Sequence, residues 1–245
     1  MDVAVIAGII MIISVVVMLV MGVPIGISIG MSSALAMITI LPFGPGIVTC
    51  AQKMFTGVNS FSLLAIPFFI LAGNIMNKGG IAIRLINFAK LFTGSIPGAL
   101  AHTNAVANML FGAISGSGTA AASAMGSIIG PIEEEEGYDR DFSAAANIAT
   151  APTGLLIPPS NVMITFSLVS GGTSVAALFM AGYIPGILWG LACMVVIYFF
   201  ARKKGYRSTK RYTGSEKVKV FFQAIPCLFM IIVVIGGIIS GIFTA

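Results

Sequence analysis

Hydroxyl-bearing residues gather at two places where the chain cannot continue a regular helix. The first is the run Ser115, Gly116, Ser117, Gly118 and Thr119. The second lies between Thr150 and Asn161 and contains three prolines. Hydroxyl oxygens, and carbonyl oxygens released from a helical ladder, are suitable ligands for a hard cation such as Na⁺. Both segments therefore supply candidate ligands for a small cation.

These candidate ligands divide by chemistry into an ion set and a solute set. Sodium would be held by hydroxyls and backbone carbonyls of Ser115, Gly116, Ser117, Gly118, Thr119, Thr150, Thr153 and Gly154. A carboxylated solute would sit nearby, because backbone N–H groups are exposed where the helices restart after each break. The residues predicted to contact the solute are Thr119, Pro158, Pro159, Ser160 and Asn161.

The absence of acidic residues from the predicted spans favours sodium over protons as the coupling ion. No Asp or Glu lies in a predicted span or hairpin arm, and a carboxylate is the usual proton carrier in a membrane relay. His102 is the only other titratable candidate there; it could relay protons, but a hydrogen-bonded packing histidine is favoured. The acidic run 133–136 could form a gate or cation funnel, but a solvated turn is favoured.

Composition identifies the elements that position these residues. Hydrophobic residues make up 58% of the 245 residues and charged residues only 9%, whereas a soluble domain carries about 25% charged residues. A membrane helix needs about 20 mostly apolar residues. The chain is therefore predicted to be an all-α polytopic membrane protein. About six spans are expected, at residues 3–21, 24–41, 58–77, 142–171, 174–201 and 222–242.

The segment 96–132 is predicted to be a re-entrant helical hairpin instead of two spans. Its flanking residues, Lys90 and Arg140, should lie on the same side of the membrane. Each glycine in the central run costs about 1 kcal/mol relative to alanine in a helix, which places the tip there. The second arm, 120–132, would reach only about 20 Å, less than the ~30 Å hydrocarbon core.

The segment 142–171 is predicted to be a discontinuous helix, unwound near residues 152–159. Proline removes a backbone donor and clashes with the preceding turn, and it also disfavours the helical conformation of the residue before it. The segments 79–92 and 216–222 are predicted to be amphipathic helices that lie in the membrane interface.

Basic residues predict the orientation of the spans. The loop 202–219 carries eight of the thirteen Lys and Arg residues, so the positive-inside rule makes it cytoplasmic. Lys78, Arg84, Lys90 and Arg140 then fall on the same side, and only Lys53 lies outside. Both ends of the chain are predicted to be periplasmic.

Several other function classes find no support in the sequence. There is no nucleophile–base pair, metal cluster or phosphate loop, so no enzyme activity and no organic cofactor are expected. Cys50, Cys193 and Cys227 form neither a metal pattern nor a disulfide framework. The net charge of +5 is explained by topology signals, so no nucleic-acid partner is expected. A passive channel, or a structural membrane subunit that moves no solute, remains the alternative to a transporter.

The chain resembles the large membrane subunit of tripartite ATP-independent periplasmic (TRAP) transporters over nearly its whole length. The resemblance rests on ordered runs of residues at 22–26, 64–73, 112–118, 137–138, 157–160, 178–182 and 241–244. It implies an elevator-type, sodium-coupled importer of organic acids such as sialic acid, C4-dicarboxylates or sugar acids. The implied partners are a small membrane subunit and a periplasmic substrate-binding protein, and the implied location is the bacterial inner membrane.

The resemblance also implies a division of the chain by role. Residues 1–95 would form spans and an amphipathic arm, and 96–172 the transport region with hairpin and broken helix. Residues 173–219 would form a span and the basic loop, and 220–245 the first span of a second, inverted repeat. The family's large subunit is about twice as long, so the chain is expected to match its first half.

The predicted topology can be tested by cysteine labelling. In a variant whose three native cysteines are replaced by serine, Lys53→Cys should react with a membrane-impermeant maleimide added from the periplasmic side. Ser208→Cys, in the basic loop, should react only after the membrane is permeabilised. Strong external labelling at position 208 together with none at position 53 would contradict the topology.

Overall fold

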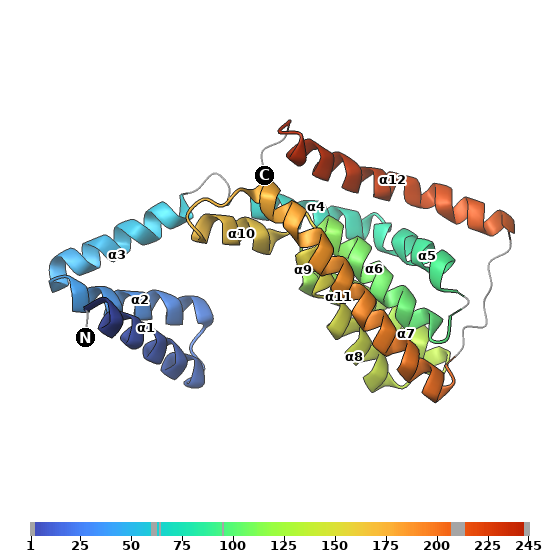
Figure 1. Cartoon of the computed structure of the whole chain (residues 1–245), viewed down its shortest axis with the longest axis horizontal. Helices are drawn as coiled ribbons and strands as arrows, with labels where there is room; N and C mark the ends of the chain where they lie inside the picture. The colour runs from blue at the N-terminus through green and yellow to red at the C-terminus, as the bar shows by residue number, and fades with distance from the viewer. Residues whose placement is uncertain (1–2, 60–62, 64, 95, 207–213, 243–245) are drawn as a thin grey trace. The chain divides into compact units, whose positions relative to one another are not determined.

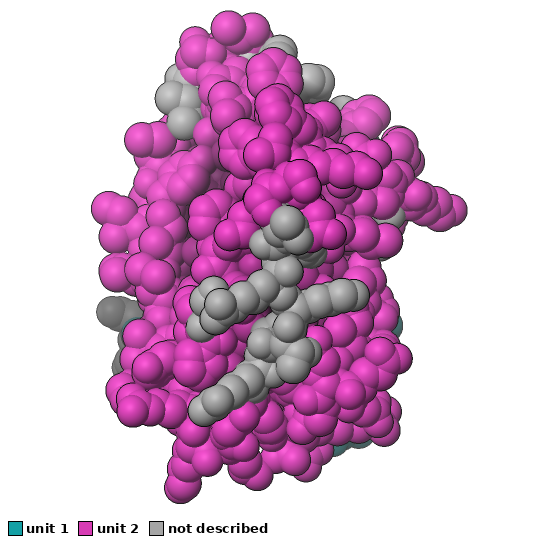
Figure 2. Space-filling model, turned by 90° about the vertical axis from the view of Figure 1, so that its right-hand side faces the viewer, with its two compact units in different colours: residues 1–61 teal, residues 62–245 magenta. Residues whose placement is uncertain are grey.

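The computed structural model of the chain describes residues 3–59, 63, 65–94, 96–206 and 214–242. Its regular elements there are the helices α1 to α12 (Figure 1). They group into two compact units, residues 1–61 and residues 62–245 (Figure 2). The prediction of an all-α protein is confirmed for these residues.

The first unit contains α1 (Val3–Val20), α2 (Ile25–Ile40) and α3 (Phe43–Val58). α1 packs along α2, and α2 packs against α3. Gly22 turns the chain between the first two helices with a φ of 79°, a conformation that glycine adopts without steric cost. Large apolar side chains such as Ile12, Val16 and Ile29 are more than half exposed, which suits lipid better than water.

The helix α3 was not predicted, because residues 42–57 were assigned to an external connection. The sequence there is only moderately apolar, and Gly44, Pro45 and Gly46 suggest a loop. In the structure Pro42 caps α3 and Pro45 lies in its first turn. The first N–H groups of a helix have no partner within it, so a proline there costs no hydrogen bond.

The second unit is built around α6 (Ala99–Ser115), which is buried along nearly its whole length. The other helices of the unit are α4 (Ala65–Lys78), α5 (Ile81–Thr93), α7 (Gly118–Glu135), α8 (Arg140–Thr150), α9 (Thr153–Leu156), α10 (Asn161–Val169), α11 (Val175–Lys204) and α12 (Gly214–Ile239). α6 packs against α5, α7, α8, α9 and α11. Its five alanines and one glycine let these neighbours approach closely.

The segment 96–132 does form a helical hairpin, but its second arm is longer than predicted. α7 continues through Pro131 to Glu135 and has 18 residues, which corresponds to about 27 Å. The acidic run thus begins within the last turn of α7, where a solvated turn was expected. Re-entry of the hairpin from one membrane face stays a prediction.

The two predicted interfacial segments have different outcomes. Residues 81–93 form a separate helix, α5, whose Leu85, Ile86 and Ala89 are buried against α6 and α7. Residues 216–222 do not form a separate element, because α12 runs without a break from Gly214 to Ile239. Residues 207–213 of the basic loop lie outside the described residues.

Fewer helices than the predicted six reach the length of a membrane span. Among the described residues, α1, α11 and α12 are long and apolar enough to cross a membrane, and the bent segment from α8 to α10 would make a fourth. α2 and α4 are apolar but have only 16 and 14 residues, so at 1.5 Å per residue they fall short of ~30 Å. The predicted start of the third span falls partly outside the described residues.

Candidate functional site

The hairpin tip is a two-residue turn between α6 and α7. α6 ends at Ser115, and Gly116 follows with a φ of 63°, which favours glycine. Ser117 then caps α7, because its Oγ accepts a hydrogen bond from the backbone N–H of Ala120 at 3.3 Å. The hydroxyls of Ser117 and Thr119 lie 3.0 Å apart. The break therefore falls within the predicted run 115–119.

The helix that follows is broken as predicted, but over fewer residues. α8 ends at Thr150, a single turn of helix forms α9, and α10 starts at Asn161 after a bend of 52°. Pro152 keeps a helical conformation at the start of α9, so only residues 157–160 leave the helical path. Ser160 caps α10 by accepting from the N–H of Met163 at 3.4 Å.

The two breaks meet in space, although more than 30 residues separate them in the sequence. The backbone N–H of Asn161 donates to the carbonyl of Gly116 at 3.2 Å. A Cβ atom on Gly116 would lie 3.1 Å from the carbonyl oxygen of Pro159, and one on Gly118 would lie 2.9 Å from that of Ala151. The tip and the broken helix are therefore in backbone contact.

A glycine pair holds the two segments together behind the tip. Gly112 on α6 faces Gly154 on α9, and a Cβ atom on Gly154 would lie 2.7 Å from the Cα of Gly112. No side chain larger than hydrogen fits between these backbones. Gly154 was predicted as a sodium ligand; that role stays a prediction, and the structure places the residue where the backbone of α9 contacts that of α6.

A buried asparagine network, which the sequence analysis missed, joins α6, α7 and α8. The side-chain amide of Asn108 lies within 3.0 Å of oxygen atoms on Asn104, Asn147 and Thr150. Asn147 in turn donates to the carbonyl of Ala122 on α7 at 2.8 Å. The available signal was polar residues four apart in an apolar stretch, at positions 104 and 108.

The predicted hydroxyl ligands differ in their burial and hydrogen bonding. Thr150 donates to the carbonyl of Ala146 and Thr153 to that of Thr150, and both threonines are fully buried. Ser117 and Thr119 are more accessible. Asn161 contributes the side-chain oxygen Oδ1, which is buried and has no hydrogen-bond partner. An oxygen in that state is suited to a cation, because its lone pairs are unsatisfied.

The structure corrects the predictions made for two titratable residues, Glu133 and His102. Glu133 was expected in a solvated turn, but it is fully buried in α7, and Glu134 and Glu135 are exposed. His102 is buried in α6, as a packing histidine would be. The hydrogen bond expected for it is absent, because neither ring nitrogen has a partner.

Comparison with known proteins identifies the family. Residues 12–245 match the family model "Tripartite ATP-independent periplasmic transporter, DctM component". This chain belongs to the DctM family. The family is one of transporter components and not of enzymes, as predicted.

Curated relatives of this DctM-family chain cover a range of named solutes. It is 54% identical over 87% of its length to the uncharacterized protein YgiK of Salmonella typhimurium. It is 41% identical over 86% to the sialic acid TRAP transporter large permease protein SiaM of Vibrio cholerae. It is 42% identical over 84% to the C4-dicarboxylate permease DctM of Pseudomonas aeruginosa. The chain spans about half the length of these relatives, 49%, 49% and 48% respectively.

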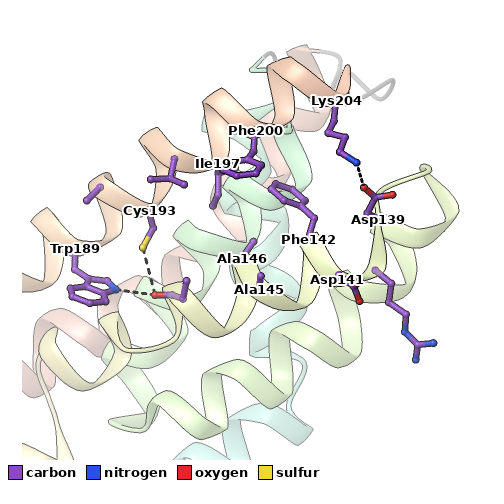
Figure 3. Close-up of a pocket in the computed structure, with 14 residues that line it drawn as sticks. Asp139, Asp141, Phe142, Ala145, Ala146, Trp189, Cys193, Ile197, Phe200 and Lys204 are labelled. Atoms are coloured by element: carbon purple, nitrogen blue, oxygen red, sulfur yellow. Dashed lines mark hydrogen bonds and ion pairs between the residues drawn. The ribbon is translucent and has the colours of Figure 1, made fainter.

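The described part of the DctM-family chain holds no group of three or more His, Cys, Asp or Glu residues that could bind a metal ion. A cavity of about 850 Å³ lies between α8 and α11, but its walls are mostly apolar (Figure 3). Some of its polar groups bind each other: Trp189 donates to the carbonyl of Ala149 at 2.9 Å, and Lys204 pairs with Asp139 at 2.7 Å. Arg140 and Asp141 also line it. These contacts link α8 to α11 along the cavity.

Two tyrosines next to Asp139 also join the start of α8 to the end of α11. Tyr206 stacks on Tyr138 with ring centroids 4.4 Å apart. The Tyr206 hydroxyl accepts a hydrogen bond from the backbone N–H of Asp139 at 3.1 Å. Lys204 and the Tyr206 hydroxyl hold the pKa of the Asp139 carboxyl below its ordinary value. The start of α8 is thus held in register with the end of α11.

The glycine contact behind the tip generates a stability prediction. Gly154→Ala should lower the thermal unfolding midpoint of the purified chain in detergent, because the added methyl group must push α9 away from α6. Overpacking of this kind costs about 1–3 kcal/mol. Gly236→Ala, on α12 with open space around its Cα, is the matched control and should leave the midpoint unchanged or slightly raised. Equal midpoints for both variants would contradict the close contact.

Proposed function

We propose that this chain serves in the large membrane subunit of a sodium-coupled secondary importer of organic acids. The observation that carries this proposal is the backbone contact between the hairpin tip and the broken helix. Where interrupted helices meet, the unpaired carbonyls at their C-terminal ends and the unpaired N–H groups at their N-terminal ends come together. Such groups can bind a cation and a carboxylate. Non-helical backbone at membrane depth is tolerated only where it is buried in protein or lines a wet cavity. Two such interruptions in backbone contact therefore favour a binding site.

Sodium would bind where the C-terminal end of α6 and the broken helix converge. Support comes from the unpartnered Oδ1 of Asn161, from the hydroxyls of Ser117 and Thr119, and from carbonyls at the tip. Neutral oxygens of this kind suit a hard monovalent cation. Thr150 and Thr153 would be further ligands, because a hydroxyl that donates its proton to a helix carbonyl keeps an oxygen lone pair for a cation.

The solute would be a small organic acid held at the helix starts. α7 and α10 both begin at this site, each behind a serine cap. The partial positive charge at a helix N-terminus attracts carboxylates. The names of two relatives, SiaM and DctM, specify sialic acid and C4-dicarboxylate respectively, so a carboxylated solute is the shared chemistry.

Transport would need two further proteins and a bilayer. The proposed partners are a small membrane subunit and a periplasmic substrate-binding protein, which the name of the family, a tripartite periplasmic transporter, implies. The proposed location is the inner membrane with both chain ends in the periplasm. The hairpin and the helices α8 to α10 would move as one body in an elevator step, because the glycine pair and the asparagine network hold them together.

A passive channel, or a non-transporting membrane subunit, is the alternative. Reconstituted uptake distinguishes these alternatives, because neither a channel nor a structural subunit can concentrate solute. Vesicles would contain a complete transporter with this chain, the small subunit and the binding protein. Accumulation of labelled solute against its gradient, driven by an imposed sodium gradient, supports the proposal. Equilibration without accumulation overturns it.

The sodium assignment predicts a specific effect of tip substitutions. Ser117→Ala or Asn161→Ala should raise the sodium concentration needed for half-maximal uptake several-fold in the complete transporter. The reason is that each removes an oxygen from the proposed coordination shell.

Ser127→Ala, on the same helix but away from the tip, is the matched control and should leave that concentration unchanged. Expression should be equal for all variants. Uptake that persists without sodium, follows an imposed pH gradient and is lost in His102→Ala would instead establish proton coupling.

A further inference from the structure

A second cavity, smaller and more polar than the first, lies at the far end of the hairpin, away from the tip. It has a volume of about 320 Å³ and is bordered by α6, α7 and α8. Its polar lining is contributed by Asn104, Glu133, Glu134, Arg140, Ser143 and Asn147. Along α7, Glu133 lies about 24 Å from Ser117, at 1.5 Å per residue. The cavity is therefore separate from the proposed sodium and solute site.

The side chain of Glu133 is the unusual feature of this cavity. It is fully buried, and neither carboxylate oxygen has a hydrogen-bond partner. The hydroxyl of Ser143, which lines the same cavity and is also buried, has no partner either. A buried polar group left unpaired destabilises the fold, and a charged group does so most strongly. Three unsatisfied oxygens around one cavity indicate a missing positively charged or hydrogen-bonding occupant.

The electrostatics of the cavity favour a cation over an anion. Two carboxylates, of Glu133 and Glu134, line it against one guanidinium, of Arg140. Arg140 and Glu134 are exposed and reach solvent, whereas Glu133 does not. The other titratable groups nearby are Tyr138 and Glu136, on the segment that follows α7, and the buried His102 on α6.

We propose that this cavity binds a monovalent cation, with Glu133 as the charged ligand and Ser143 as a neutral oxygen ligand. The amide oxygens of Asn104 and Asn147 are already shared with Asn108, and a carbonyl-type oxygen can accept a second interaction because it has two lone pairs. A single buried carboxylate among neutral oxygens suits a monovalent ion better than Ca²⁺, which takes six to eight oxygen ligands.

A cation at this site must compete with protons. Burial raises the pKa of Glu133 to about 7, and the nearby Ser143 opposes that rise without a well-formed hydrogen bond. Only the deprotonated carboxylate binds the cation. Below pH 7 the proton fraction grows, so apparent affinity for the cation falls about tenfold for each further pH unit. Above pH 7 the affinity levels off.

The experiment measures the thermal unfolding midpoint of the purified chain in detergent against sodium chloride concentration, with choline chloride keeping the ionic strength constant. The half-saturating sodium concentration should be about tenfold higher at pH 6 than at pH 8. A tip site made of neutral oxygens gives no such pH dependence, so failure here and failure of the proposed function are distinguishable. Potassium chloride in place of sodium chloride reports the ion selectivity.

Variants assign the pH dependence to the cavity. Glu133→Gln should abolish it, whereas Glu134→Gln, the exposed neighbour, and Ser117→Ala, at the tip, should keep it. Ser143→Ala should raise the half-saturating concentration several-fold at both pH values, which tests the site even if Glu133→Gln fails to fold. The proposal is overturned if the unaltered chain shows the same half-saturating concentration at pH 6 and pH 8. It is also overturned if Glu133→Gln keeps the difference, or if acid alone stabilises the chain and sodium has no effect.

Discussion

Each interruption of a helix inside the 62–245 unit releases backbone groups that a bilayer cannot hydrogen-bond. The structure meets this constraint by bringing two interruptions together. The carbonyl of Gly116 accepts from the N–H of Asn161, and serine side chains at 117 and 160 cap the helices that restart. The first break thus supplies a hydrogen-bond acceptor for the second, and each restarting helix has its own serine cap. The Oδ1 of Asn161 is buried without a partner and lies beside the tip, where an ion would bind.

The contact between the breaks depends on how closely the surrounding helices approach. Gly112 and Gly154 let two backbones touch, and Asn108 connects α6 to α8 where apolar packing alone would let them slide. Apolar contacts carry little directional information in lipid, whereas buried hydrogen bonds and small residues specify one arrangement. The asparagine network therefore serves the candidate site by fixing where the tip meets the broken helix.

The two ends of the hairpin differ in chemistry. Its tip presents neutral oxygens and glycine backbone, and its base contains the buried carboxylate of Glu133. Both ends contact the same neighbour, since α8 carries Asn147 and Ser143 near the base and leads into the broken helix at the tip. An occupant at the base would thus act on the helix that positions the tip.

The sequence by itself determined the all-helical class, the family, the hairpin and the position of both breaks, because glycine runs, paired prolines and long uncharged stretches act locally. It did not determine which side chains meet. Residues 42–57 look like a connection, yet they form α3, since a proline in the first turn costs no hydrogen bond. Glu133 looks solvated beside three other glutamates, yet it is buried. The sequence likewise does not show that Thr153 donates to a helix carbonyl or that Gly154 contacts the backbone of Gly112. Burial and pairing depend on helices distant in sequence, and only the tertiary structure decided them.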